Sequence, residues 1–311
     1  MQDGPNFNEL FERRQTLPDI DARERLARLI GIEDQKSRLA KMLSLLINPA
    51  DLEAWAKKFH PNANSIVAAV TNRPPLVVLA GDVGSGKTEL AETIGDAVAR
   101  NLGLDITLLP LSLSSRGEGR VGEMTQLLSA AFDYTVSEAI KLKGNNGPAR
   151  GGLILLVDEA DALAQSREMA QMHHEDRAGV NTFIRGVDQI AHAGVPAAVV
   201  TCTNRLNALD PAVKRRAADI LAFSRPNDEQ RRAFLQPALS EIGLSTTVID
   251  EIVSATGPDQ ARDYGFTFSD LTQRLLPSIV LDAYPTQAVE PKQALDIARR
   301  TVPTPPFKEE F

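Results

Sequence analysis

A long run of basic residues is the first feature that the sequence lacks. The 311-residue chain has 34 Lys and Arg against 41 Asp and Glu, a formal net charge of −7, and its basic residues nowhere stand in a long uninterrupted series. A protein that grips nucleic acid needs clustered Lys and Arg to displace counterions from the phosphates. We therefore expect no direct contact with nucleic acid.

Cysteine is almost absent as well. Cys202 is the single cysteine, and it lies in the apolar run Ala197–Thr203, where we expect a buried thiol. One cysteine cannot form an internal disulfide, so nothing indicates an oxidising compartment. The first residues lack a basic or apolar leader, and no apolar stretch approaches the length of a membrane span. These absences predict a cytoplasmic protein that does not use a membrane.

Tryptophan occurs once, as Trp55. A lone tryptophan on a helical segment is typical of a packing residue, and we expect packing here. The following segment, Pro61–Pro75, has the Asn and Pro residues of a loop with at most one short turn. Residues 1–29 are polar and charged, which predicts a short N-terminal extension.

Short apolar runs alternate with helix-periodic segments from Leu76 onward, as in a parallel sheet that is covered by helices. After Pro226 only helical segments follow, and Thr267–Asp270 has the pattern of a capping box. We predict an α/β domain over residues 30–225, a small all-α domain over 226–301 and a flexible tail over 302–311. Five strands are predicted: Leu76–Ala80, Ile106–Leu111, Leu153–Val157, Ala197–Thr203 and Ile220–Phe223.

The strongest local pattern is the glycine-rich run at residues 81–88, which matches G-x-x-x-x-G-K-[ST]. Its backbone N–H groups are suited to a β-phosphate, Lys87 to the β- and γ-phosphates, and the Thr88 hydroxyl to Mg²⁺. An ordinary glycine turn is the alternative, but a predicted strand precedes the run and an amphipathic helix follows it. The sequence therefore predicts a site for ATP and Mg²⁺, formed by Gly81, Asp82, Val83, Gly84, Ser85, Gly86, Lys87 and Thr88.

Polar residues also follow two of the predicted buried strands. Asp158 ends one strand, where it can hold Mg²⁺ through water, and Glu159 can take a proton from an attacking water. The alternative is a pair of acids that solvates a strand end. Asn204 ends another strand and can orient the same water, although an Asn at this place is often a turn residue. We predict that these three residues join the ATP site.

Two adjacent arginines, Arg215 and Arg216, follow Leu209–Lys214. Such a pair is commonly a solvated patch, but P-loop enzymes gain rate when a guanidinium reaches the γ-phosphate, often from another molecule. If each copy supplies an arginine to its neighbour, the contact is head-to-tail, and such contacts close into rings.

Together these residues resemble the AAA+ ATPases, from about Ile30 onward. In that family the segment that Leu29–Lys36 resembles packs on adenine, which implies such a role for Ile30 and Gly31. Asn204-Arg205 is similar to the family's sensor-one strand end, and Gly265–Leu271 to its lid motif. Where some members have a second sensor arginine this chain has Ser269, with Arg274 one turn later. The resemblance implies a P-loop AAA+ large domain with a five-stranded parallel sheet and a helical lid.

Two stretches resemble the HORMA-remodelling ATPases of the pachytene-checkpoint kind, in particular the bacterial members that accompany CBASS antiphage signalling. These stretches are Val180–Ile190 and Arg216–Ile220, and the second makes Arg216 the slightly preferred finger. The resemblance implies a homohexamer that pulls on the N-terminal segment of a HORMA-domain protein. It also implies that the HORMA protein is stripped from a nucleotidyltransferase, which switches signalling off.

The same resemblance places two pore loops. Arg120, Val121 and Gly122 fall where the first pore loop grips a threaded chain, although a plain surface turn is an alternative for this glycine-rich run. His173 and His174 fall in the second pore loop. Two adjacent histidines lack the spacing of a helical metal pair, so we expect polar contacts and not a metal site.

Three other functions remain open for this chain. The first is a DNA-handling AAA+ protein, which the acidic balance opposes. The second is a general unfoldase that feeds a protease, although no protease motif is present in the sequence. The third is a nucleotide-binding switch without motor action, which Glu159 and the two arginines make less favourable.

Overall fold

The computed structural model describes residues 10–113, 123–144, 149–163, 174–207, 209–260 and 262–306. These residues form two compact units. The first unit contains residues up to Ala27, Asp34–Ala80 and Thr88–Ala222, and the second contains Arg28–Glu33, Gly81–Lys87 and the residues from Phe223 onward. The second unit therefore includes the glycine-rich loop as well as the C-terminal helices. Within the described residues, none of the helices is long and apolar enough to cross a membrane.

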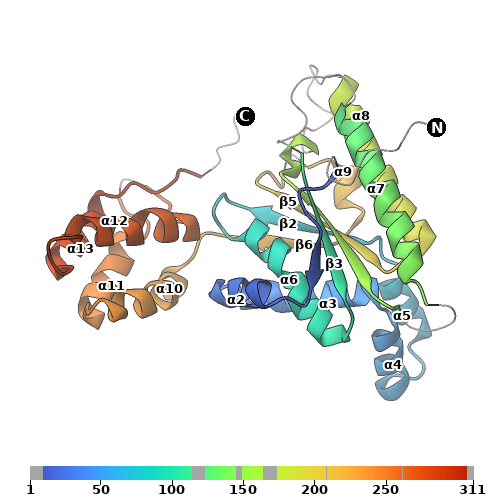
Figure 1. Cartoon of the computed structure of the whole chain (residues 1–311), viewed down its shortest axis with the longest axis horizontal. Coiled ribbons are helices and arrows are strands. Elements are labelled where there is room, and N and C mark those ends of the chain that lie inside the picture. The colour runs from blue at the N-terminus through green and yellow to red at the C-terminus, as the bar shows by residue number, and fades with distance from the viewer. Residues whose placement is uncertain are drawn as a thin grey trace. The chain divides into compact units, whose positions relative to one another are not determined.

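The first unit is an α/β structure, which confirms the predicted fold class (Figure 1). Its strands form a six-stranded sheet in the order β1-β3-β4-β5-β2-β6. The strands are β1 (Gln15–Leu17), β2 (Leu76–Gly81), β3 (Ile106–Ser112), β4 (Gly152–Asp158), β5 (Ala197–Thr203) and β6 (Ala217–Phe223). The helices are α2 (Ile20–Arg28), α3 (Glu33–Ile47), α4 (Ala50–Phe59), α5 (Asn64–Thr71), α6 (Lys87–Leu102), α7 (Glu123–Leu142), η1 (Ala160–Leu163), α8 (His174–Ala193) and α9 (Pro211–Lys214).

The prediction of five parallel strands missed β1. This strand pairs antiparallel with β3, with Gln15 opposite Leu108 and Leu17 opposite Ile106. The neighbouring pairs β3–β4, β4–β5 and β2–β5 are parallel. Three residues with one buried apolar side chain are too short to show the alternation that marks a strand. The predicted N-terminal extension thus supplies an edge to the sheet.

Both faces of the sheet are covered by helices, so the central strands β4 and β5 are buried, except for the half-buried Asp158 at the end of β4. On one face, α7 and α8 lie side by side, and Phe132 meets Phe183 with ring centroids 5.8 Å apart (Figure 1). On the other face α6 packs so closely that a Cβ added to Gly95 would lie 2.5 Å from Leu17 and 3.4 Å from Ile154. Cys202 is buried in β5 as a thiol outside any disulfide, as the sequence predicted.

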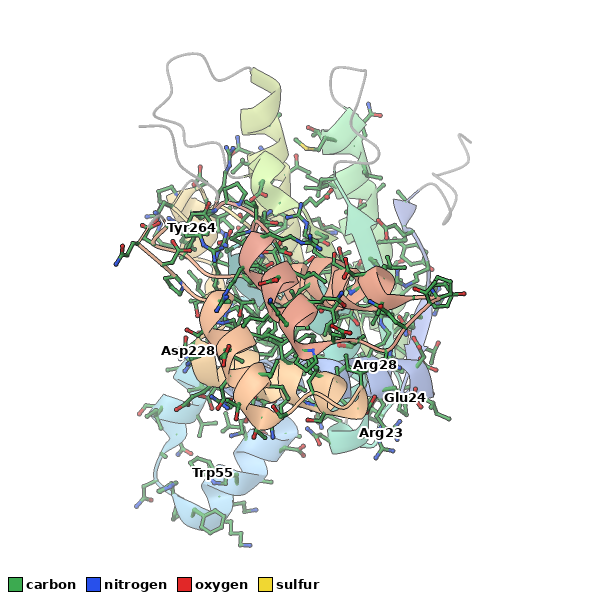
Figure 2. All side chains as sticks on the ribbon, turned by 90° about the vertical axis from the view of Figure 1, so that its left-hand side faces the viewer. Arg23, Glu24, Arg28, Trp55, Asp228 and Tyr264 are labelled. Carbon is green, nitrogen blue, oxygen red and sulfur yellow. The ribbon has the colours of Figure 1, made fainter. Side chains whose placement is uncertain are left out.

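The hairpin of α4 and α5 differs from both predictions for this region. The segment expected to be a loop contains the eight-residue helix α5, whose run of Ile, Val and Ala between Asn and Pro residues is itself apolar. Trp55 does not pack in a core, because 49% of it is exposed (Figure 2). Its ring contacts are with neighbours on the same helix and its end, Phe59 and His60.

The C-terminal part of the second unit is all helical, as predicted. Its helices are α10 (Asp228–Glu241), α11 (Thr246–Ala255), the π-helical turn η2 (Asp270–Leu275), α12 (Leu276–Ala283) and α13 (Pro291–Arg300). Leu235, Ile252, Phe266 and Leu275 lie in their common core. The predicted capping box forms, since the Thr267 N–H donates to Asp270 Oδ2 and the Asp270 N–H donates to Thr267 Oγ1, both at 3.0 Å.

The expected loose tail is wrong for its first residues. The Thr304 N–H and hydroxyl both donate to the Asp270 carboxylate, and the hydroxyl lies 2.7 Å from Oδ1. Pro303 is buried. A buried carboxylate needs hydrogen-bond donors, and Thr304 supplies two of them. Residues 301–306, which we call the C-terminal strap, are therefore part of the helical unit, and residues 307–311 lie outside the described residues.

Candidate nucleotide-binding site

The glycine-rich loop has the backbone that phosphate binding requires. Gly84 and Gly86 have φ values of +72° and +93°, in the left-handed region that favours glycine. The Lys87 ammonium donates to the carbonyl oxygens of Gly81 at 2.9 Å and Asp82 at 2.8 Å. These bonds hold the loop in a closed curve around the lysine. The loop thus places several backbone N–H groups beside the Lys87 ammonium. This arrangement suits the phosphates of a nucleotide.

The lid motif contacts this loop within the second unit. The Ser269 N–H donates to the Gly84 carbonyl at 3.2 Å. A Cβ added to Gly84 would lie 2.7 Å from Ser269 Cβ and 2.8 Å from Thr267 Oγ1, so the loop and the motif touch. Ser269, which stands where some relatives have an arginine, therefore meets the loop through its backbone. Arg274 instead donates to the Val302 carbonyl of the C-terminal strap at 3.2 Å.

The segment expected to meet adenine lies in the same unit. Leu29 and Ile32 approach Gly86, with their terminal carbons 3.5 and 3.9 Å from a Cβ placed there. Ile30 is half-buried, and the Gly31 carbonyl accepts from Gln230 Nε2 at 2.5 Å. Gly31 has a φ of +84°, which explains a glycine at this turn. The segment predicted to contact adenine thus offers apolar side chains and backbone groups. It is bonded to α10 through the Gly31 carbonyl.

Thr88 and Asp158 come together in the first unit. The Thr88 hydroxyl donates to Asp158 Oδ1 at 3.4 Å. Burial raises the pKa of Asp158, while hydrogen bonds from the Glu159 N–H and Thr88 oppose that rise. A hydroxyl and a carboxylate are oxygen ligands of the kind that Mg²⁺ prefers, and a cation would offset the burial of the charge. This pair fits a magnesium site, and Thr88 directly follows Lys87 in the chain.

Glu159 has an unusual backbone. Its φ is +54°, and it is the one non-glycine residue with positive φ in the described part of the chain. Its N–H donates to Asp158 Oδ1 at 2.8 Å, and the residue is exposed. The left-handed conformation costs a residue with a Cβ about 1–2 kcal/mol. Strain of this kind is commonly kept where a side chain must be aimed at a reacting group.

Asn204 is held by a residue that the sequence analysis did not identify. Asp161, in η1, accepts from the Asn204 N–H at 2.9 Å, from Asn204 Nδ2 at 3.0 Å and from Thr203 Oγ1 at 2.6 Å. One carboxylate thus fixes both the backbone and the amide of Asn204. The available signal was the spacing: Asp161 lies three residues after Asp158, in the short helix η1 that follows β4.

The two arginines differ sharply in surroundings. Arg216 forms a bidentate ion pair with Asp188 of α8, and this carboxylate raises the pKa of the Arg216 guanidinium. Arg215 is exposed at the C-cap of α9. Arg216, which the sequence slightly favoured as the finger, thus already has an acidic partner in its own chain.

Acidic residues of α6 are neutralised by the N-terminal segment. Arg25 of α2 donates to both carboxylate oxygens of Glu89 at 2.8 Å and to Glu92 at 2.7 Å. Arg13 adds a second ion pair to Glu92 at 2.9 Å. Burial opposes the charge of Glu92, but the two arginines lower its pKa. The N-terminal extension thus compensates the negative charge of Glu92, one helical turn after Thr88. This charge also contributes to the raised pKa of Asp158.

Arg120, Val121, Gly122 and His173 lie outside the described residues. His174 begins α8, but its side chain is also outside them.

Comparison with known proteins gives consistent matches. Residues 77–225 match the family described as ATPase family associated with various cellular activities (AAA). The chain is 64% identical over 303 residues to CD-NTase-associated protein 6 of Escherichia coli strain MS 115-1, covering 97% of each chain. It is 36% identical over 299 residues to the protein of that name from E. coli strain KTE188, covering 96% of this chain and 97% of that one.

Solved structures agree with these matches. A chain in the structure of the E. coli MS115-1 HORMA:CdnC:Trip13 complex is 63% identical, with a TM-score of 0.92 over 98% of this chain and 100% of that chain. The structure of Rhizobiales Trip13 is 56% identical, with a TM-score of 0.76 over 96% of this chain and 100% of that chain.

Proposed function

Because the chain belongs to the AAA ATPases, and among them to the Trip13-like CD-NTase-associated proteins, we propose that it is an ATP-driven ring motor that remodels a HORMA-domain protein. The observation that carries this proposal is the likeness, at 63% identity, to a chain solved in a complex with HORMA and CdnC. The partner of this chain would then be a HORMA protein bound to a nucleotidyltransferase. Its removal from that enzyme would switch antiphage signalling off.

The nucleotide site supports hydrolysis and not binding alone. Bound ATP with Mg²⁺ supplies the phosphoanhydride bond whose hydrolysis drives the work. Lys87 and the backbone of the loop bind and orient the phosphates, while Thr88 and Asp158 hold the metal. A carboxylate oxygen of Glu159 takes the proton of the attacking water. Asn204, fixed by Asp161, orients that water.

The arginines support a homohexameric ring in which each copy completes the site of its neighbour. Arg215 is exposed, so it is available to another molecule. Arg216 is anchored to Asp188 and holds the turn that carries Arg215. We therefore assign the finger to Arg215 and the anchoring role to Arg216. In this proposal Arg215 contacts the nucleotide of another copy of the chain, whereas Arg216 contacts α8 of its own chain.

Threading through the pore rests on residues outside the described part. Val121 would contact the threaded segment through apolar atoms, and Arg120 would donate to its carbonyl oxygens. Gly122 would complete this first loop, and His173 and His174 would add polar contacts from the second loop.

Trapping the partner tests the function. Glu159→Gln should bind ATP but hydrolyse it very slowly, so its rings should retain the HORMA protein by its N-terminal segment. Lys87→Ala is the matched control, because it should lose nucleotide binding and hence the partner. Recovery of DNA, or of a protease, in place of the HORMA protein would favour the DNA-handling or unfoldase alternatives and reject this one.

A further inference from the structure

The phosphate-binding loop contains an acidic residue, which is unexpected in a loop that we propose holds an anionic nucleotide. Asp82 occupies the second position of the loop, and both of its carboxylate oxygens are used. Oδ1 accepts from the Val83 N–H at 2.9 Å, and Oδ2 accepts from Arg225 Nε at 2.5 Å. A carboxylate so close to bound phosphates would weaken their binding if it stood alone.

Arg225 lies between β6 and α10 and reaches three parts of the second unit. Besides Asp82, its Nη1 donates to the Gly265 carbonyl at 2.7 Å and to the Thr304 carbonyl at 2.8 Å. Its guanidinium carbon lies 4.9 Å from the ring centroid of Tyr264 (labelled in Figure 2). One side chain thus joins the phosphate-binding loop, the start of the lid motif and the C-terminal strap.

The surroundings of Arg225 indicate more than a surface ion pair. Its side chain is 12% exposed and that of Asp82 is 16% exposed, so solvent screens the pair weakly. Arg225 Nη2 is buried and has no hydrogen-bond partner among the described residues. A buried donor without a partner lowers stability, so the placement of this arginine is not explained by stability alone.

We propose that Arg225 is a positioning residue that neutralises Asp82 and fixes the phosphate-binding loop to the lid motif and the C-terminal strap. This inference rests on the proposed ATP site and deepens it. Neutralisation lets the loop accept an anion despite its own carboxylate. The shared guanidinium holds the loop and the strap through one rigid planar group, so loss of Arg225 should loosen both.

Nucleotide affinity gives the first test, with a fluorescent ATP analogue in the presence of Mg²⁺. Arg225→Ala leaves Asp82 uncompensated and should weaken binding by roughly tenfold. Adding Asp82→Asn to that variant should restore most of the affinity, because the asparagine keeps the acceptor for Val83 and removes the charge. Asp82→Asn alone should bind as tightly as the wild type or more tightly. A double variant that binds no better than Arg225→Ala overturns the charge role.

Hydrogen exchange of the nucleotide-free protein gives the second test, and it does not depend on ATP. Arg225→Ala should raise exchange both in residues 81–87 and in the strap, whereas Asp82→Asn should raise it in residues 81–87 alone. Arg225→Lys keeps the charge but cannot span three acceptors, so it should keep affinity and still loosen the strap. It also carries the test if Arg225→Ala does not fold.

Arg232→Ala is the control, because Arg232 of α10 forms its ion pair with Asp250 of α11 and not with Asp82. It should match the wild type in both measurements. A strap whose exchange is unchanged in Arg225→Ala overturns the shared tie. A wild-type protein that binds no ATP rejects the proposed function, and the exchange pattern still decides whether Arg225 joins the three segments.

Discussion

Arg216 and Asp188 form a two-pronged ion pair within one chain, with Nε 2.7 Å from Oδ1 and Nη2 2.9 Å from Oδ2. Both side chains are about one-third exposed, at 31% and 35%. This geometry ties the turn after α9 to α8, and it leaves the adjacent Arg215 exposed. The pair therefore separates the roles of two arginines that look equivalent in the sequence.

The first prediction concerns these two residues. Arg215→Ala should lower ATP turnover by on the order of 10³, because a finger acts on charge that develops at the γ-phosphate. ATP affinity should change far less. Arg216→Ala should lower turnover less strongly, and Asp188→Asn should resemble it, since each removes one side of the same anchor.

Mixed rings provide the control for this prediction. Combining Arg215→Ala with Lys87→Ala subunits should restore part of the activity, because some interfaces then contain both intact groups. A large loss in Arg216→Ala with little effect of Arg215→Ala would reverse the assignment of the finger.

The second prediction concerns the strained backbone at Glu159. In ordinary positions alanine is more favourable than glycine, but at a φ of +54° the Cβ is the source of strain. Glu159→Gly should therefore exceed Glu159→Ala in unfolding free energy by about 1 kcal/mol. Chemical denaturation of the nucleotide-free proteins measures this difference, and both variants should lack turnover. A less stable glycine variant would show that the backbone at residue 159 is relaxed.

The third prediction concerns Asp161. Asp161→Ala removes three hydrogen bonds from Thr203 and Asn204, so Asn204 should lose its fixed orientation. We expect kcat to fall by about tenfold to a hundredfold, in the range of a misplaced catalytic group, with KM for ATP nearly unchanged. Asn204→Ala should cause a similar loss, and the double variant should be little worse than either single one. Additive losses would mean that Asp161 acts independently of Asn204.

The parts of this site that the sequence predicted are local in the chain. Residues 81–88 form a contiguous motif, and Asp158 ends a strand that its apolar run marks clearly. Asp161 and Arg225 were missed because their roles depend on partners far away: Asn204 is 43 residues from Asp161, and Asp82 is 143 residues from Arg225. Such pairs follow from the packing within each unit, which a single sequence does not specify.

The fold shows the same division between local and distant causes. Strands β2 to β5 follow from buried apolar runs, whereas β1 depends on pairing with β3, about 90 residues further along the chain. The prediction of a loop over the segment that contains α5 was wrong for another reason. None of the residues of this apolar helix is buried in the single chain, so the usual link between apolar periodicity and a covered face does not hold there.

The last prediction concerns the charge of Asp158. Burial raises its pKa in the folded protein above the ordinary value, so folding favours the protonated form. The sign follows from linkage: the favourable contribution to the unfolding free energy is fully present below the unfolded pKa, and it is lost as pH rises through the folded pKa.

At neutral pH without metal the buried carboxylate of Asp158 thus destabilises the protein. Asp158→Asn should then unfold at a higher temperature than the wild type, and the difference should shrink as the pH falls toward about 4. Mg²⁺ with ATP should reverse the order, because the wild type gains a ligand for the cation and the variant loses one. Thermal unfolding with and without Mg²⁺-ATP, from pH 4 to 8, measures both effects, and Thr201→Val in the neighbouring strand gives a control without a titrating group. An asparagine variant that is less stable at neutral pH without metal would mean that the carboxylate is compensated within the chain itself.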